Sequence, residues 1–146
     1  MYSINHRIGI NAPVSAIYQA LTTNEGLAQW WTNDVSGAGD VGAIIKFRFN
    51  GGGPDFAVAQ LITDELVRWQ HKGNVPEAWR GTEISFSLES TTEQVFVNFS
   101  HCHWQESSDF MAHCNSKWAV FLLSLKALLE VGKGRPFPED IQIDHA

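Results

Sequence analysis

The densest group of ionisable side chains in this sequence is the triplet His101-Cys102-His103, which is followed ten residues later by the pair His113-Cys114. Imidazole and thiolate groups suit zinc, so metal binding is the first chemistry that these residue types suggest. The spacing does not match the usual zinc motifs. Neighbouring residues of a strand point to opposite faces, so His101 and Cys102 cannot readily share one ion.

His113 and Cys114 are no better placed for a shared ion, because adjacent residues of a helix point about 100° apart. A three-ligand set of His101, His103 and Cys114 remains geometrically open. On the spacing of all five residues we expect neither a bound metal nor another cofactor.

His101 has two further interpretations, because strand alternation places it on an inward face beside Phe99. It is either a buried histidine that hydrogen-bonds a neighbour, or the polar anchor of an apolar pocket and a general acid or base. Cys114 would be a nucleophile only if a histidine lowered its pKa, and we interpret it as pocket lining. No pair of inward carboxylates accompanies these groups, so the sequence favours a binding protein over an enzyme.

Alternating apolar residues predict the strands that carry these groups, at 2–10, 45–49, 56–62, 66–71, 84–88 and 95–103. Turn residues separate the strands, including a glycine-rich hairpin at 51–54 and a longer loop at 73–81 that contains Trp79. Local hairpins predict an antiparallel sheet with one buried face, and that face is rich in aromatic side chains.

Residues 107–138 predict one long helix of about two dozen residues, long enough at ~36 Å to cross a small domain. Ser107 or Ser108 caps its first turn, and Gly132, Gly134 and Pro136 end it. An apolar stripe along the helix consists of Met111, Cys114, Trp118, Phe121, Leu122, Leu125 and Leu129.

Two short helices are predicted between the first and second strands. Pro13 stands near the start of the first helix, where its missing amide costs nothing. Asn24 is expected to cap the second, which carries Trp30 and Trp31 toward the mouth of any cavity.

Composition bounds the class of protein. The 146 residues fit a single domain, 1–146, and 44% hydrophobic with 18% charged residues is typical of globular proteins. A net charge of −6 without a Lys/Arg cluster argues against nucleic acid and anionic membranes as partners. We expect no signal peptide and no membrane insertion, and two cysteines fit a cytoplasmic protein.

Several motifs together resemble the START-like, or SRPBCC, superfamily, and within it the branch of activators of a heat-shock chaperone ATPase. These motifs are Ala12-Pro13-Val14 through Thr22, the segment 26–32 with its Trp30-Trp31 pair, the strand 97–101, and above all the helix 118–129 with its stop signal 130–136. The resemblance implies an α+β helix-grip fold, in which a curved antiparallel sheet wraps around a long C-terminal helix.

The resemblance also implies a cavity between sheet and helix that binds a hydrophobic or amphipathic small molecule. The expected ligand-binding residues are Trp30, Phe47, Trp69, Phe86, Phe99, His101, Cys114, Trp118 and Phe121. Two alternatives stay open: a co-chaperone-like interaction module, and a cyclase or hydrolase that uses the same cavity.

The back of the long helix carries Val120, Leu123 and Ala127 where a solvent-exposed face should be polar. Either the edge of the sheet or the C-terminal tail covers these residues, or they form a homodimer contact.

Overall fold

The sheet in the computed structural model, which describes residues 1–73 and 75–143, is antiparallel throughout and has the strand order β1-β7-β6-β5-β4-β3-β2. Its strands are β1 (Tyr2–Ile10), β2 (Asp34–Ser36), β3 (Ile44–Arg48), β4 (Asp55–Ile62), β5 (Leu66–His71), β6 (Glu83–Ser90) and β7 (Val95–Trp104). Hairpins join β3 through β7 in sequence, whereas β1 returns to pair with β7 at the edge. The predicted α+β helix-grip fold is confirmed.

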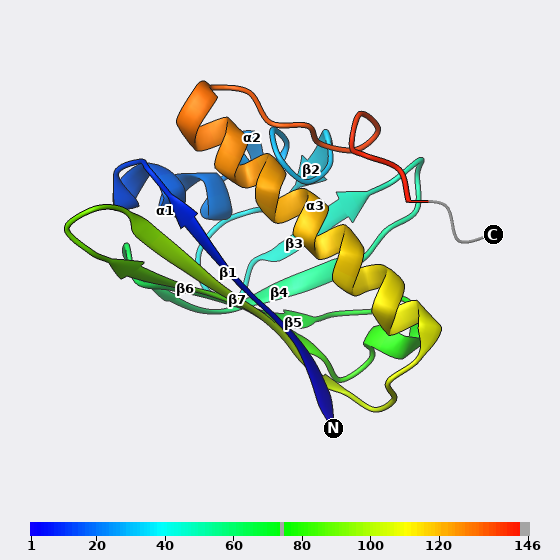
Figure 1. Ribbon diagram of the computed structural model, residues 1–146. Helices are drawn as coiled ribbons and strands as arrows, with labels where there is room; N and C mark the ends of the chain where they lie inside the picture. Colours follow the sequence, from blue (N-terminus) through cyan, green and yellow to red (C-terminus); the bar gives the residue numbers. More distant parts are fainter. Residues whose placement is uncertain (74, 144–146) are drawn as a thin grey trace.

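The long helix α3 (Asp109–Val131) lies across one face of the curved sheet (Figure 1). The side chain of Ser108 accepts a hydrogen bond from the amide of Met111 at 3.2 Å, and Gly132 ends the helix with φ of 83°. Both are the end signals that the sequence predicts, because a hydroxyl satisfies a free amide and glycine adopts the left-handed conformation without a Cβ penalty.

The two short helices, α1 (Val14–Thr22) and α2 (Asn24–Leu27), follow β1 as expected. Two details differ from the prediction. Thr23, not Asn24, caps α2, and Asn24 instead accepts a hydrogen bond from the amide of Ala38 at 2.9 Å. The helix also ends before Trp30 and Trp31, so the turn that follows it carries both indoles into the interior.

The core lies between α3 and the sheet, where strand alternation sends aromatic side chains inward. Phe47, Trp69, Phe86 and Ile84 are at most 1% exposed. One surprise is Trp79, which ends a short 3-10 helix, η1 (Glu77–Trp79), inside the predicted loop and is only 9% exposed. Among the helices of the described residues, none is long and apolar enough to cross a membrane.

Candidate functional site

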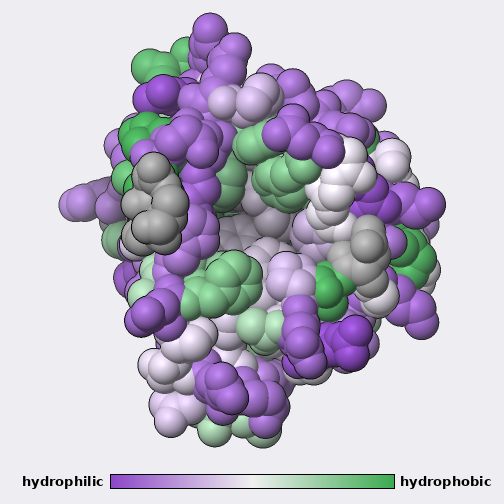
Figure 2. Space-filling view, turned by 90° about the vertical axis from the view of Figure 1, so that its right-hand side faces the viewer, coloured by the Kyte–Doolittle hydropathy of each residue, from purple (hydrophilic) through white to green (hydrophobic). Residues whose placement is uncertain are grey.

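A pocket of about 600 Å³ opens beside the first half of α3. Figure 2 shows it as a hollow in the face that carries the C-terminal segment and the β3–β4 hairpin. Its wall on α3 consists of Phe110, His113, Cys114, Lys117, Trp118 and Phe121, and Trp31 and Trp79 are part of the same lining. The pocket is therefore a side entrance into the space between helix and sheet.

Segments without regular structure form the rest of the rim. The hairpin contributes Phe49 and 52–54, the β5–β6 loop contributes Val75 and Pro76, and the chain after α3 contributes Phe137, Asp140 and Gln142. The last segment is fastened at Phe137, whose amide donates to the carbonyl of Trp31 at 2.7 Å and whose carbonyl accepts from the amide of Asn33 at 3.1 Å.

Trp31 is the centre of the aromatic wall. Its ring centroid lies 4.2 Å from that of Phe47 and 5.0 Å from that of Trp118. On the rim, the rings of Phe49 and Phe137 meet edge-on at 5.1 Å. Such offset and tilted contacts are the arrangements that aromatic rings prefer, so the wall is well packed although the pocket beside it is open.

One ion pair, Lys117 with Asp140, interrupts the apolar wall. The Asp140 side chain is 1% exposed and that of Lys117 is 19% exposed. Lys117 Nζ also donates to the carbonyl of Ile141 at 3.0 Å, and Gln142 Nε2 donates to Asp140 Oδ1 at 3.1 Å. These contacts fasten the C-terminal segment to α3 and place polar hydrogen-bonding groups at the rim.

Beneath the pocket, His101 stands in a continuous chain of hydrogen bonds. Trp118 Nε1 donates to His101 Nδ1 at 3.1 Å. Because Nδ1 accepts, the ring proton lies on Nε2, which donates to Thr82 Oγ1 at 2.9 Å. The Thr82 hydroxyl donates in turn to the carbonyl of Trp79 at 2.6 Å. This chain ties α3 and β7, through the residue just before β6, to η1.

Burial sets the protonation of His101 and Cys114. It lowers the pKa of His101 from its ordinary 6.5 to about 3, because burial removes the hydration that the charged ring needs. Burial likewise raises the pKa of the Cys114 thiol to about 11. At neutral pH the imidazole is therefore uncharged and the thiol keeps its proton.

The nine predicted ligand-binding residues fall into two groups. Cys114, Trp118 and Phe121 line the pocket. The other six lie in the core outside the lining, each at most 2% exposed: Trp30, Phe47, Trp69, Phe86, Phe99 and His101. Trp30, expected near the mouth, instead donates its indole N–H to the carbonyl of Ala20 at 2.9 Å deep in the protein.

Sequence reasoning missed most of the rim. Trp79 and Phe137 are large aromatic residues in segments bounded by proline and glycine, which is a weak signal for buried loop residues. Nothing in the sequence pairs Lys117 with Asp140, because the two are 23 positions apart and meet only when the chain folds back along α3. The set His101, His103 and Cys114 is not brought together, because His101 is fully buried and His103 is exposed.

Comparison with known proteins relates the chain to a family. The family model described as "Activator of Hsp90 ATPase homolog 1-like protein" matches residues 11–130. A solved structure described as the Aha1 dimer from Colwellia psychrerythraea is 67% identical, with a TM-score of 0.86 over 92% of this chain and 100% of that one. Among curated proteins, none matches.

More distant structures share the fold alone. Protein SSP2350 from Staphylococcus saprophyticus is 16% identical, with a TM-score of 0.77 over 92% of this chain and 97% of that one. DynU16, a putative protein in the dynemicin biosynthetic locus, is 23% identical, with a TM-score of 0.74 over 90% of this chain and 48% of that one. The match over 11–130 and the 67% identity to the Colwellia protein together place this chain in the family of Activator of Hsp90 ATPase homolog 1-like proteins.

Proposed function

We propose that this protein binds an apolar or amphipathic small molecule in the pocket beside α3. The observation that carries the proposal is an open pocket of about 600 Å³ whose wall includes Trp31, Trp79, Trp118 and Phe121. Sites for drug-sized ligands are typically concave, about 300–1,000 Å³ in volume, and apolar apart from a few polar groups. This pocket has all three properties.

The polar groups restrict the class of ligand. Lys117 and Asp140 already neutralise each other, so the rim offers hydrogen-bonding groups without a strong net charge. An apolar body would pack among the aromatic rings, while a hydroxyl, carbonyl or similar end would meet the ion pair. The six predicted residues in the core would support the pocket from beneath, and Cys114, Trp118 and Phe121 would contact the ligand.

The same geometry disfavours the enzyme alternative. An acid or base must reach the proton that it transfers, but His101 is fully buried and both of its ring nitrogens are engaged. Cys114 lacks the lowered pKa of a nucleophilic thiol.

A bulky residue at the rim tests the binding proposal. Gly52 lines the pocket, and a Cβ added there meets nothing within 4 Å, so Gly52→Phe would intrude without a backbone clash. Gly39→Phe is the matched control, because Gly39 lies in an exposed segment outside the pocket. We expect the fluorescent probe 1-anilinonaphthalene-8-sulfonate to bind the Gly52 variant at least about tenfold more weakly than the control, about 1.4 kcal/mol.

Equal binding of the probe by both variants, with circular dichroism showing both folded, would contradict the proposal. Native mass spectrometry of gently purified protein adds an independent measurement. A co-purifying adduct that is lost in Gly52→Phe and kept in Gly39→Phe would identify the natural ligand by its mass.

The family match favours a second candidate, a co-chaperone-like interaction module. Stimulation of ATP hydrolysis by purified Hsp90 on addition of this protein, at molar ratios near one, would support it. The candidate fails if the rate of ATP hydrolysis stays unchanged and pull-down experiments detect no binding of this protein to Hsp90.

A homodimer is a third inference, because the 67% identical Colwellia protein is described as a dimer. We propose the back of α3 as the contact: Leu123 is 56% exposed there, and Val120 and Ala127 beside it are half-buried. Light scattering should give a dimer mass for the native chain and a monomer mass for Leu123→Glu. A dimer that survives this substitution places the interface elsewhere.

We also infer a cytoplasmic location, which the two free cysteines favour.

A further inference from the structure

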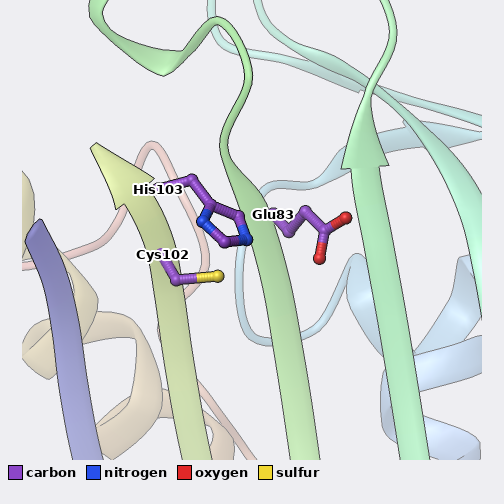
Figure 3. Close-up of side chains that lie close together, drawn as sticks. All are labelled: Glu83, Cys102 and His103. Carbon is purple, nitrogen blue, oxygen red and sulfur yellow. The ribbon is translucent and has the colours of Figure 1, made fainter. Parts of the chain in front are cut away.

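Three potential metal ligands meet on the outer face of the sheet, away from the pocket. The ligand atoms of Glu83 on β6 and of Cys102 and His103 on β7 all lie within 4.8 Å of one another. Figure 3 shows the Cys102 and His103 side chains extending from the end of β7 toward β6, the strand that carries Glu83. Cys102 is half-buried and His103 is exposed, so solvent reaches the cluster.

A β-bulge explains why two consecutive residues share a face. Tyr2 pairs with Trp104 and Ile4 with His101, so Cys102 and His103 together oppose the single residue Ser3. The extra residue is accommodated at His103, whose φ of 70° lies in the left-handed region. A bulge of this kind interrupts the alternation of side chains, and both His101 and Trp104 consequently stay buried while Cys102 and His103 face outward.

Glu83 is held in place by neighbours on the adjacent strand. Its Oε1 accepts from Gln70 Nε2 at 2.8 Å and from Arg68 Nη1 at 3.2 Å. Its other oxygen, Oε2, has no hydrogen-bond partner within the described parts of the chain. Arg68 and Gln70 thus hold the carboxylate in place through one oxygen and leave the other available to bind a cation, which is how ligating carboxylates are commonly supported.

We propose that Glu83, Cys102 and His103 form a site for a divalent zinc-like cation. A tetrahedral ion with bonds of about 2.0–2.3 Å needs its ligand atoms roughly 3.3–3.6 Å apart. The three ligand atoms now lie within 4.8 Å of one another. Small side-chain rotations can bring them to the shorter separation, because Cys102 and His103 lie at a strand end and His103 is exposed. A thiolate and an imidazole select zinc over magnesium or calcium, which prefer oxygen ligands.

The charges and the thiol proton around the site affect how strongly it binds a cation. The neighbouring carboxylate of Glu83 favours a cation at this position, and the Cys102 thiol must lose its proton when it binds one. The Arg68 guanidinium partly offsets the charge of Glu83 and reduces the pull on a cation. Three protein ligands also leave the fourth position to water, so we expect binding weaker than at a four-ligand structural zinc site.

Cobalt and zinc titrations of the full chain test the proposal. After treatment with a chelator, Co²⁺ should bind in a one-to-one ratio and produce a thiolate-to-cobalt charge-transfer band, which Zn²⁺ should abolish and Mg²⁺ should leave unchanged. Isothermal titration with Zn²⁺ should give the same stoichiometry. The melting temperature should rise when Zn²⁺ is added.

Substitutions assign the ligands. Cys102→Ser should remove the charge-transfer band, and His103→Asn should lower Zn²⁺ affinity at least about tenfold, about 1.4 kcal/mol. Asparagine is chosen because it tolerates the left-handed backbone at this position. Glu83→Gln should weaken binding, whereas Glu89→Gln on the same strand should not. Cys114→Ala should keep the band, since that thiol lies in the pocket wall.

The proposal is overturned if Co²⁺ gives no thiolate band in the native chain, or if the band persists in Cys102→Ser. It is also overturned if Zn²⁺ binds His103→Asn and the native chain equally. Circular dichroism of each variant verifies that the outward substitutions leave the fold intact.

Discussion

The two ends of the space between α3 and the sheet are built from the same aromatic residue types, yet only one end is closed. At the closed end, Trp30 and Phe86 pack edge-on at 6.1 Å, and Leu122 of α3 is fully buried. At the open end, Phe49 and Phe137 are only half-buried beside a pocket of about 600 Å³. Trp118 stands between them, where it donates a hydrogen bond to His101 beneath and lines the pocket above.

The contrast follows from what faces α3. At the closed end, strands supply a regular row of inward side chains, and side chains on helix and sheet interdigitate at high density. At the open end, a hairpin, a loop and the chain after α3 supply the rim. Such segments place few side chains inward, because their own backbone groups need water or specific partners. The pocket therefore forms where regular structure ends.

The largest expected effect comes from truncating matched aromatic residues at the two ends. Phe86→Ala should lower the free energy of unfolding by about 3–5 kcal/mol, because the cavity left in a dense core cannot collapse. Phe137→Ala should cost about 1 kcal/mol or less, because its ring already borders open space. Urea denaturation monitored by fluorescence measures the free energy of unfolding of both variants. Equal decreases in the two variants would remove the distinction between closed and open ends.

Trp118→Phe isolates the hydrogen bond from Trp118 to His101, which lies between the closed and the open end. Phenylalanine keeps most of the ring packing but leaves His101 Nδ1 buried without a donor, which should cost about 1–3 kcal/mol. Trp31→Phe is the matched control, because Trp31 is also buried and lines the same pocket. If the two variants unfold at the same urea concentration, the contact between Trp118 and His101 contributes no more than ordinary packing.

The pH dependence of stability tests the neutral histidine beneath the pocket. Burial lowers the pKa of folded His101 from 6.5 to about 3, so between these values the unfolded chain binds a proton that the folded chain does not. Stability is therefore fully present above pH 6.5 and falls as the pH decreases. Between pH 7 and pH 5 the expected loss is about 2 kcal/mol. His101→Gln should show a smaller loss over the same interval, and an unchanged slope would contradict the assignment.

The smallest effect is expected at the rim. Asp140→Ala removes the partner of Lys117 and of Gln142, which should cost about 1 kcal/mol in global stability. Hydrogen exchange should accelerate in 136–143 and remain slow in β6 and β7, because the rim opens locally. Glu139→Ala, an exposed neighbour, is the control. Acceleration throughout the sheet would show that the rim and the core unfold together.

The sequence alone predicted the regular parts of the molecule. Alternation placed Phe86 and Phe99 inward, and Ser108 and Gly132 marked the ends of α3. These features are local, because the period of a strand and the capping of a helix depend on a few adjacent residues. For the same reason Cys114, Trp118 and Phe121 could be assigned to the helix face that reaches the pocket.

Tertiary structure decided the rest. Phe137 and Asp140 reach the pocket only because the chain turns back along α3, and Trp79 enters the core from a loop that has no periodic pattern. The bulge at Cys102 and His103 is set by the pairing of β7 with β1, far away in sequence. Adjacent residues point to opposite faces in a regular strand, and only long-range pairing can interrupt that rule and bring two metal-binding side chains to one face.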